Sequence, residues 1–151
     1  MIQGRFVSED RERRIAEDIF CKASLHPYLQ ETCMERKDSL IQALVYEGAE
    51  DSCPAAAGCM SMKQEEARIL SVAVLPEYRG KAYGEFVIRM LIDKAKTNGI
   101  KRVTLSCQNE MSGYFQKLGF REDEKSENRD RIVCINMTYE VIDGKCCSKS
   151  I

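Results

Sequence analysis

The stretch from Val72 to Gly84, VAVLPEYRGKAYG, decides the fold. Its first four residues are apolar, as at the end of a buried strand, and Pro76 ends that strand. A glycine-containing loop and the apolar spacing of a helix follow at once. Backbone N–H groups in such a loop and in the first helical turn lack a partner, and the helix dipole adds positive charge there. The stretch therefore predicts a phosphate-binding loop, to which Arg79 and Lys81 add mobile cations.

Two familiar nucleotide-binding loops do not match this stretch. A Walker loop needs Gly-Lys followed by Ser or Thr, whereas Gly80-Lys81 is followed by Ala82. The dinucleotide pattern Gly-x-Gly-x-x-Gly does not fit either. Glycine and basic residues between a strand and a helix can also do no more than turn the chain. Taken alone, the loop leaves a plain turn as the alternative interpretation.

Helices and strands are expected on both sides of the stretch. Before it, two short amphipathic helices are followed by one strand and then by an antiparallel pair of strands. After it, a helix stops at Asn98-Gly99, and a strand, a helix and a last strand follow. The expected helices are Ile15–Ser24, Leu29–Lys37, the helix from Gly84 and Met111–Leu118; the expected strands are Ser39–Tyr46, Ala55–Met62, Ala67–Leu75, Arg102–Cys107 and Ile132–Val141. The charged stretch Arg121–Arg131 is assigned no element.

The composition bounds the class of protein. A chain of 151 residues with 44% hydrophobic and 31% charged side chains is typical of one globular domain, which we place at 1–142, followed by a flexible tail at 143–151. The 23 basic and 24 acidic residues nearly cancel, which argues against a nucleic-acid partner. The apolar stretches are too short to span a membrane, and the N-terminus lacks the features of a signal peptide. We therefore expect a cytoplasmic protein.

The cysteines give no sign of a metal site. Eight are present, and in a cytoplasmic protein reduced thiols are expected rather than disulfides. Most stand singly, and Cys146-Cys147 lacks the spacing of zinc ligands. We expect no bound metal.

Two motifs resemble the GNAT acyltransferase superfamily. They are the stretch Val72–Gly84 and the segment Tyr114–Phe120, YFQKLGF, which occur in the order and spacing of that family. The resemblance is strong over Ser71–Phe120, while Met1–Pro54 carries no signature of the family. It implies an α/β fold of the GNAT type, with a mixed, mostly antiparallel sheet flanked by helices.

The resemblance also implies a site for acetyl-coenzyme A as cosubstrate. The loop amides would hold the pyrophosphate, and the pantetheine arm would pair with the strand backbone where that strand splays from Arg102–Cys107. The implied coenzyme-binding residues are Val72, Ala73, Val74, Arg79, Gly80, Lys81, Ala82, Tyr83, Gly84, Asn109, Phe115 and Lys117. Asn109 is equally suited to cap the following helix, and Lys117 to cover a surface helix.

Two positions depart from the family pattern. Glycine is usual where Ala82 stands, and alanine fits there only with a negative φ and a slightly displaced phosphate. The usual tyrosine position holds Phe115, and Tyr114 lies one residue earlier, as in the histone-type branch of the family. We assign Tyr114 as the general acid for the departing thiolate; the alternative is an ordinary half-buried aromatic.

An acceptor amine must lose a proton, which a carboxylate can take as general base, directly or through water. The candidates are Glu47, Glu65, Glu66 and Glu110. We assign Glu66 because it lies on the strand that leads to the thioester, on the face of Arg68. The alternative is a solvated residue of the hairpin.

The predicted function is transfer of the acetyl group of acetyl-coenzyme A to a primary amine, by direct attack in a ternary complex. A small molecule or an amino acid is expected as acceptor ahead of a protein amine, and the last strand or the tail offers a surface for a homodimer. The alternative is a non-catalytic acyl-coenzyme A sensor or partner-binding module of the same fold. A flavodoxin-like domain is disfavoured, because no crossover helix separates the strands within 55–75.

Overall fold

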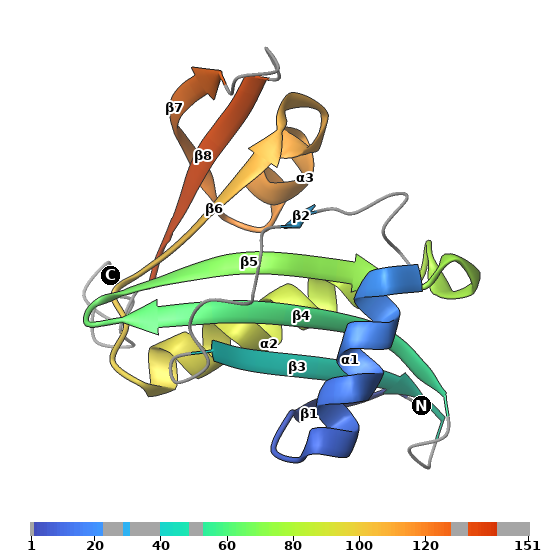
Figure 1. Ribbon diagram of the computed structural model, residues 1–151. Helices are drawn as coiled ribbons and strands as arrows, with labels where there is room; N and C mark the ends of the chain where they lie inside the picture. The colour runs from blue at the N-terminus through green and yellow to red at the C-terminus, as the bar shows by residue number, and fades with distance from the viewer. Residues whose placement is uncertain (1, 23–28, 31–39, 49–52, 128–132, 142–151) are drawn as a thin grey trace, which may run out of the picture. The chain divides into compact units, whose positions relative to one another are not determined.

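The computed structural model describes residues 2–22, 29–30, 40–48, 53–127 and 133–141 (Figure 1). Its strands are β1 (Ile2–Phe6), β2 (Leu29–Gln30), β3 (Leu40–Glu47), β4 (Pro54–Lys63), β5 (Glu66–Val74), β6 (Arg102–Gln108), β7 (Arg121–Glu127) and β8 (Val133–Glu140). Its α-helices are α1 (Asp10–Lys22), α2 (Tyr83–Thr97) and α3 (Ser112–Lys117), and two short 3-10 helices are η2 (Pro76–Tyr78) and η3 (Asn109–Met111).

The strands follow the hydrogen-bonded order β1-β3-β4-β5-β6-β8-β7, and β2 pairs with β5 beside that path. The pairs β1–β3, β3–β4, β6–β8 and β7–β8 are antiparallel, whereas β5 and β6 are parallel. The prediction of a mixed, mostly antiparallel sheet with flanking helices is therefore confirmed.

The helix predicted from Gly84 is the best match between pattern and structure. Val87, Ile88, Leu91 and Ala95, spaced three and four residues apart, are all fully buried along α2. Gly99 follows the helix with φ +78, the left-handed conformation that ends a helix most easily when the residue is glycine. The strands predicted at 39–46, 55–62, 67–75, 102–107 and 132–141 are also present, with bounds shifted by at most one residue.

The start of the chain differs from the prediction. Strand β1 precedes α1, so the expectation that the chain begins with helices is wrong. β1 shows no clear alternation because it is an exposed strand with Gln3, Gly4 and Arg5 at its centre. The helix predicted at Leu29–Lys37 is also wrong at Leu29–Gln30, which form β2; its other residues lie outside the described part.

The charged stretch that received no element contains a strand. Arg121–Glu127 forms β7, which pairs with β8 at the end of the strand order. An edge strand needs no apolar face of its own, and charged side chains protect its open edge from pairing with other chains. The sequence of β7 therefore shows no hydrophobic periodicity from which a strand could be predicted.

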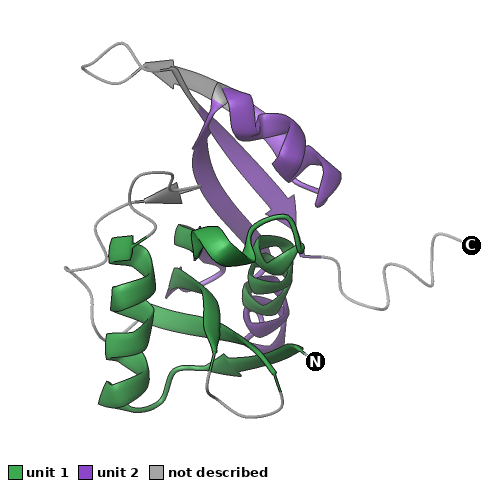
Figure 2. Cartoon of the chain, turned by 90° about the vertical axis from the view of Figure 1, so that its right-hand side faces the viewer, with its two compact units in different colours: residues 1–61, 69–91 green, residues 62–68, 92–151 purple. Residues whose placement is uncertain are grey.

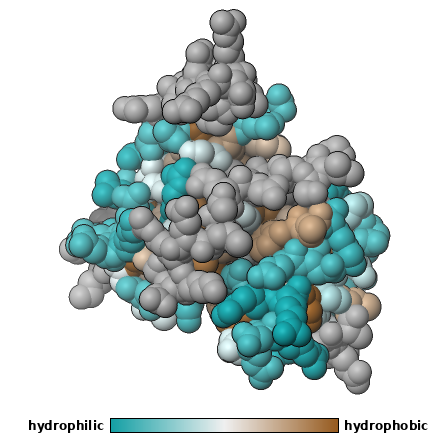
Figure 3. Space-filling model, in the orientation of Figure 1, coloured by the Kyte–Doolittle hydropathy of each residue, from teal (hydrophilic) through white to brown (hydrophobic). Residues whose placement is uncertain are grey.

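The chain divides into two compact units, residues 1–61 with 69–91 and residues 62–68 with 92–151 (Figure 2). In the first unit, Ala16 and Ile19 of α1 pack with Leu44, Tyr46 and other apolar side chains of the strands. The outward side of α1 is hydrophilic (Figure 3).

On the other face of the strands of the first unit, α2 approaches the backbone closely. A Cβ added at Gly58 would lie 2.4 Å from Val87 and 3.0 Å from Leu91. A Cβ at Gly4 would lie 2.5 Å from Met90. Glycine at these two strand positions therefore lets the helix pack directly on the backbone.

The second unit has its own core between α3 and one face of β6 and β8. Alternate residues of these strands are buried, among them Leu105 and Met137. The rings of Phe115 and Phe120 lie 5.8 Å apart in an edge-to-face arrangement, and the ring of Tyr139 lies 5.5 Å from that of Phe120. These aromatic rings fix α3 on the sheet.

Among the described residues, no helix is both long enough and apolar enough to cross a membrane.

Candidate functional site

The predicted strand, loop and helix follow one another in the first unit as the sequence indicated. β5 ends at Val74, and the amide of Leu75 still donates to the carbonyl of Ala55 at 2.9 Å. η2 then turns the chain, with Pro76 at its start, and α2 begins at Tyr83. The residues between them, 79–82, form the loop.

Two residues of this loop have a left-handed backbone. Gly80 has φ +83 and Ala82 has φ +65. The expectation of a negative φ at Ala82 is therefore wrong: the alanine adopts a left-handed conformation, which glycine would adopt without strain. The left-handed conformation costs an L-residue about 1–2 kcal/mol.

The first amides of α2 have no acceptor inside the helix. The first bond of the helix runs from the amide of Phe86 to the carbonyl of Ala82 at 3.1 Å. Helix geometry leaves the amides of Tyr83, Gly84 and Glu85 without an acceptor inside the helix. Ala82 has no side-chain oxygen that could cap them. Together with the helix dipole, these amides favour an anion at this end.

A glutamate at the end of another strand contacts two side chains at the loop. The Nζ of Lys81 lies 3.2 Å from Oε2 of Glu47, at the end of β3, and the hydroxyl of Tyr83 donates to the same oxygen. This hydrogen bond, with burial and the carboxylate charge, raises the pKa of Tyr83 to about 12. The hydrogen bonds from Tyr83 and then Lys81 hold the pKa of Glu47 below its ordinary value, with desolvation opposing them.

This contact was not found from the sequence, because 34 residues separate Glu47 from Lys81. Glu47 was considered only as a candidate base. An acidic residue at the end of a strand gives no signal of which loop it will meet in the fold.

Arg79 contacts the strand rather than open solvent alone. Its Nε donates to the carbonyl oxygen of Val74 at 3.2 Å. The backbone of Val74 was predicted to pair with pantetheine. Its carbonyl oxygen already accepts this hydrogen bond from Arg79. Lys81 also lies 5.7 Å from the ring centre of Tyr78, within the range of a cation–π contact.

The strand predicted to receive pantetheine is buried and only partly paired with β6. Val72, Ala73 and Val74 are all buried. The parallel register with β6 covers only 66–68 against 102–104, although β6 continues to Gln108. Beyond it, Ser71 and Val72 pair with Gln30 and Leu29 of β2. The parallel pairing thus ends early, as the resemblance implied for a splayed pair.

The second unit carries the residues of the second motif. Tyr114 is half-buried in α3, and its ring lies 5.2 Å from that of Phe115. Phe115 is fully buried, so its side chain belongs to the core and only its backbone is left for a ligand. Lys117 is exposed in the last turn of α3, and Asn109 begins η3.

Glu66, the assigned base, lies at the first residue of β5, directly after the hairpin turn. One of its carboxylate oxygens lies 3.7 Å from Nη2 of Arg102, and the other accepts a bond of 3.5 Å from the hydroxyl of Thr104. Val72 is six residues further along the strand, about 20 Å at the rise of a β-strand. This position agrees with the alternative of a solvated hairpin residue, and its role as base stays a prediction.

The described residues contain no group of three or more His, Cys, Asp or Glu side chains arranged to hold a metal.

Comparison with known proteins identifies the family. Residues 9–120 match the model of the acetyltransferase (GNAT) family. Because this match spans most of the chain, the chain belongs to the GNAT family. The fold class and the family predicted from the two motifs are therefore confirmed.

Individual relatives agree with this assignment. The chain is 33% identical over 86 residues to glucosamine 6-phosphate N-acetyltransferase 1 of Oryza sativa subsp. japonica. The aligned residues cover 52% of each protein. It spans about half the length of the curated relatives it matches.

Solved structures show the same fold. The ribosomal-protein-S18-alanine N-acetyltransferase of Escherichia coli superposes with a TM-score of 0.73 at 17% identity, over 93% of this chain and 96% of that one. An acetyltransferase of Bacillus subtilis in complex with CoA superposes with a TM-score of 0.71 at 16% identity, over 94% of this chain and all of the other.

Proposed function

We propose that this chain is an N-acetyltransferase that moves the acetyl group of acetyl-coenzyme A to a primary amine. The observation that carries the proposal is the loop 79–82 with the N-terminus of α2. It combines amides without an acceptor inside the helix, two left-handed residues and two cationic side chains. Two relatives are named as N-acetyltransferases of glucosamine 6-phosphate and of an alanine of a ribosomal protein. These names support an amine as the acceptor.

The proposed reaction is a direct acyl transfer. The neutral amine nitrogen attacks the thioester carbonyl, the C–N bond forms, and the C–S bond of the thioester breaks. The coenzyme leaves as a thiolate, which takes a proton from the hydroxyl of Tyr114 in our proposal. The proton of the amine passes to a carboxylate, directly or through water. No step requires an oxidant, a reductant or a metal.

Lys81 has a particular part in this proposal. Its ammonium group stands beside the helix N-terminus and is held by Glu47. A phosphate that arrives at the amides of α2 would draw Lys81 toward itself. Hydrogen bonds between charged groups contribute about 1.5–3 kcal/mol, so Lys81 should matter to affinity.

The first experiment is calorimetric titration of acetyl-coenzyme A onto the wild type and Lys81→Ala. We expect Lys81→Ala to weaken binding by about tenfold or more, because it removes a cation from the phosphates. Lys96→Ala is the matched control, since Lys96 is an exposed lysine of the last turn of the same helix. It should bind like the wild type. Absence of binding to the wild type at millimolar coenzyme would overturn the proposal.

Turnover separates an enzyme from a sensor. Release of free thiol from acetyl-coenzyme A should require an amine and should fall in Tyr114→Phe. A wild type that binds the coenzyme but releases no thiol with any amine would be the non-catalytic sensor.

A further inference from the structure

Glu47 contacts the loop between β5 and α2 on both sides of Ala82. Its Oε2 lies 3.2 Å from Nζ of Lys81, the residue before Ala82. The same oxygen accepts a hydrogen bond from the hydroxyl of Tyr83, the residue after Ala82. All four residues belong to the first unit. One carboxylate therefore ties together the two neighbours of a residue whose φ is +65.

The backbone of Glu47 is itself held in place. Its amide donates to the carbonyl oxygen of Cys53 at 2.9 Å, and its Cα lies opposite that of Ile2 in the pairing of β3 with β1. The end of β3 is thus fixed on both sides. A side chain on such a fixed backbone can hold a neighbouring loop in one conformation.

The two contacts of Glu47 differ in their surroundings. The side chains of Lys81 and Glu47 are 51% and 35% exposed, and an ion pair between exposed groups adds little stability. Tyr83, by contrast, is 4% exposed. A buried hydroxyl costs free energy unless it has a hydrogen-bond partner, so the bond from Tyr83 is the stronger constraint. Because Tyr83 is the first residue of α2, this bond fixes the point at which the helix begins.

Ala82 needs a constraint of this kind. A left-handed backbone is unfavourable for alanine, and such strain persists only where the surroundings determine the conformation. The carbonyl of Ala82 accepts the first hydrogen bond of α2, from the amide of Phe86. A change of φ at Ala82 would turn the preceding peptide group relative to this first turn. The arrangement of loop and helix amides that we propose for the coenzyme phosphates therefore depends on the backbone of Ala82.

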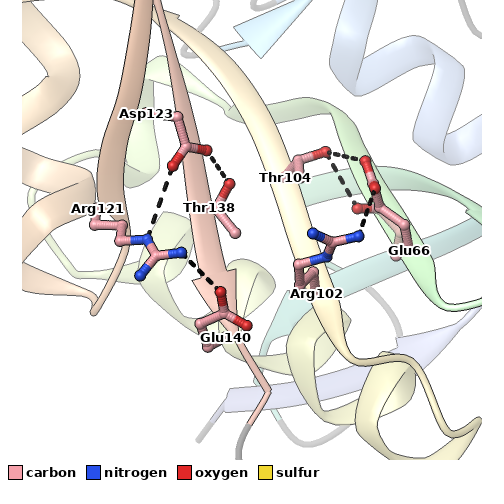
Figure 4. A network of polar contacts seen from close by, with 8 residues as sticks. Glu66, Arg102, Thr104, Arg121, Asp123, Thr138 and Glu140 are labelled. Carbon is pink, nitrogen blue, oxygen red and sulfur yellow. Dashed lines mark hydrogen bonds and ion pairs between the residues drawn. The ribbon is translucent and has the colours of Figure 1, made fainter.

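Other acidic side chains form ion pairs between neighbouring strands (Figure 4). Glu66 of β5 lies 3.7 Å from Arg102 of β6, and Arg121 of β7 lies 2.8 Å from Glu140 of β8. Both pairs join strands that are already paired with each other in the sheet. Glu47 instead joins a strand to a loop, so its contacts can decide which conformation the loop adopts.

We propose that Glu47 is a positioning residue for the coenzyme: by holding Lys81 and Tyr83 it keeps Ala82 left-handed, so that the loop has its phosphate-binding shape before acetyl-coenzyme A arrives. This inference rests on the proposed function and adds to it a residue of β3, outside the two sequence motifs. A loop that already has its binding conformation loses less free energy to ordering when the ligand binds.

The opposite effect of Glu47 would be competition with the coenzyme. A carboxylate beside bound phosphates repels them and competes with them for Lys81. If this repulsion were the main effect, removal of the carboxylate would strengthen coenzyme binding. Under our proposal its removal weakens binding, so the sign of the change decides between the two effects.

The test is calorimetric titration of acetyl-coenzyme A at a temperature at which circular dichroism shows every variant to be folded. We expect Glu47→Ala to bind about fivefold or more weakly than the wild type, because binding must then force Ala82 back into a left-handed backbone. Glu47→Gln should lose less, since its amide oxygen can still accept from Tyr83. Unchanged or tighter binding by Glu47→Ala would overturn the proposal.

Glu140→Ala is the matched control. It also removes an exposed carboxylate with a cationic partner, at the shorter distance of 2.8 Å, but this pair joins two strands. It should bind acetyl-coenzyme A like the wild type. An equal loss in Glu140→Ala and Glu47→Ala would show that the effect is not specific to the loop, and the proposal would fail.

A second background asks whether Glu47 acts through Ala82. In Ala82→Gly, the added Glu47→Ala change should lose clearly less affinity, since glycine adopts the left-handed conformation without strain. A general structural role of Glu47 predicts the same fold loss in both backgrounds. Equal losses would therefore contradict the proposal even if Glu47→Ala binds weakly.

The outcomes separate this inference from the proposed function. If the wild type binds the coenzyme and Glu47→Ala binds it equally well, only the inference fails. If the wild type does not bind, the acetyl transfer fails, and urea unfolding of the wild type, both single variants and the double variant still tests the loop. Glu47→Ala should then cost less stability in the wild type than in Ala82→Gly, because the released loop relieves the strain at Ala82. Equal costs would show that Glu47 does not hold Ala82.

Discussion

Ala82 is a residue whose backbone departs from the conformation that its type prefers. Its φ of +65 belongs to the left-handed region, and it stands between the left-handed Gly80 and the start of α2. Strain of this kind persists when the surroundings determine the backbone. Here the end of β5, held to Ala55, and the first turn of α2 fix both ends of the loop.

Ala82→Gly should therefore stabilise the protein. Glycine relieves about 1–2 kcal/mol of strain but adds freedom to the unfolded chain, so a net gain of about 0.5–1 kcal/mol in the free energy of unfolding is expected. Gly80→Ala is the reverse experiment, because φ is +83 and no atom lies within 4 Å of the added Cβ. It should lose about 1 kcal/mol. Urea unfolding measures the change in stability of both variants. Changes of the same sign in the two variants would contradict this explanation.

Glu47 links a strand to the loop through charge, which makes the contact depend on pH. Its pKa is lowered in the folded protein from an ordinary 4.5, so the folded state favours the carboxylate. The stability from this contact is present above the ordinary pKa and is lost as pH falls through the lowered folded pKa. Glu47→Gln should therefore be less stable than the wild type at pH 7, and the difference should shrink in acid.

Unfolding by urea at a series of pH values measures this difference. A difference that stays constant down to pH 3 would show that the charge of Glu47 does not stabilise the fold. Repeating the series in a Tyr83→Phe background serves as the control, because the hydroxyl that donates to Glu47 is then absent. The effect of Glu47→Gln should be smaller in that background.

Among the elements, α2 and β4 show how closely a helix can approach a sheet. A Cβ at Gly58 would lie 2.4 Å from a side-chain carbon of Val87, so any larger residue must displace that side chain or the helix that carries it. The apolar spacing of α2 predicts which face is buried. It does not predict the distance at which that face meets the strands, which depends on glycine in β4.

Gly58→Ala should cost about 1–3 kcal/mol of stability, because the added methyl group overpacks the interface. Gly113→Ala is the matched control within α3, where no atom lies within 4 Å of the new Cβ. That change should be neutral or stabilising by up to about 1 kcal/mol, since alanine is the better helix former. Thermal and urea unfolding compare the two variants. Equal stability changes would show that steric contact at Gly58 is not what limits the packing.

In the whole molecule, the elements with strong hydrophobic periodicity were predicted from the sequence, whereas the strands at the two ends of the strand order were not. α2, β5 and β6 have apolar patterns because they are buried by neighbours on the faces that the pattern marks. β1 and β7 are edge strands with exposed or charged residues, and β2 has only two residues. A strand that is held by one partner and buries little surface leaves no periodic trace in the sequence.

The candidate site divides in the same way. The loop between β5 and α2 was predicted because a strand end, a glycine and a helix start are local features that a short stretch encodes by itself. The partners of Lys81 and Arg68 were not predicted, since Glu47 and Ser106 lie 34 and 38 residues away in the chain. The left-handed φ of Ala82 was not predicted either, because alanine intrinsically prefers a negative φ.

The sequence by itself determined the family, the order of the central elements and the position of the loop between β5 and α2, because these depend on local backbone preferences and on hydrophobic periodicity. Only the tertiary structure decided that Glu47 holds Lys81 and Tyr83, that Phe115 is buried, and that Arg68, Ser106 and Asn136 form one hydrogen-bonded chain. Such contacts join strands that are distant in sequence, and their register is set by the packing of the sheet as a whole.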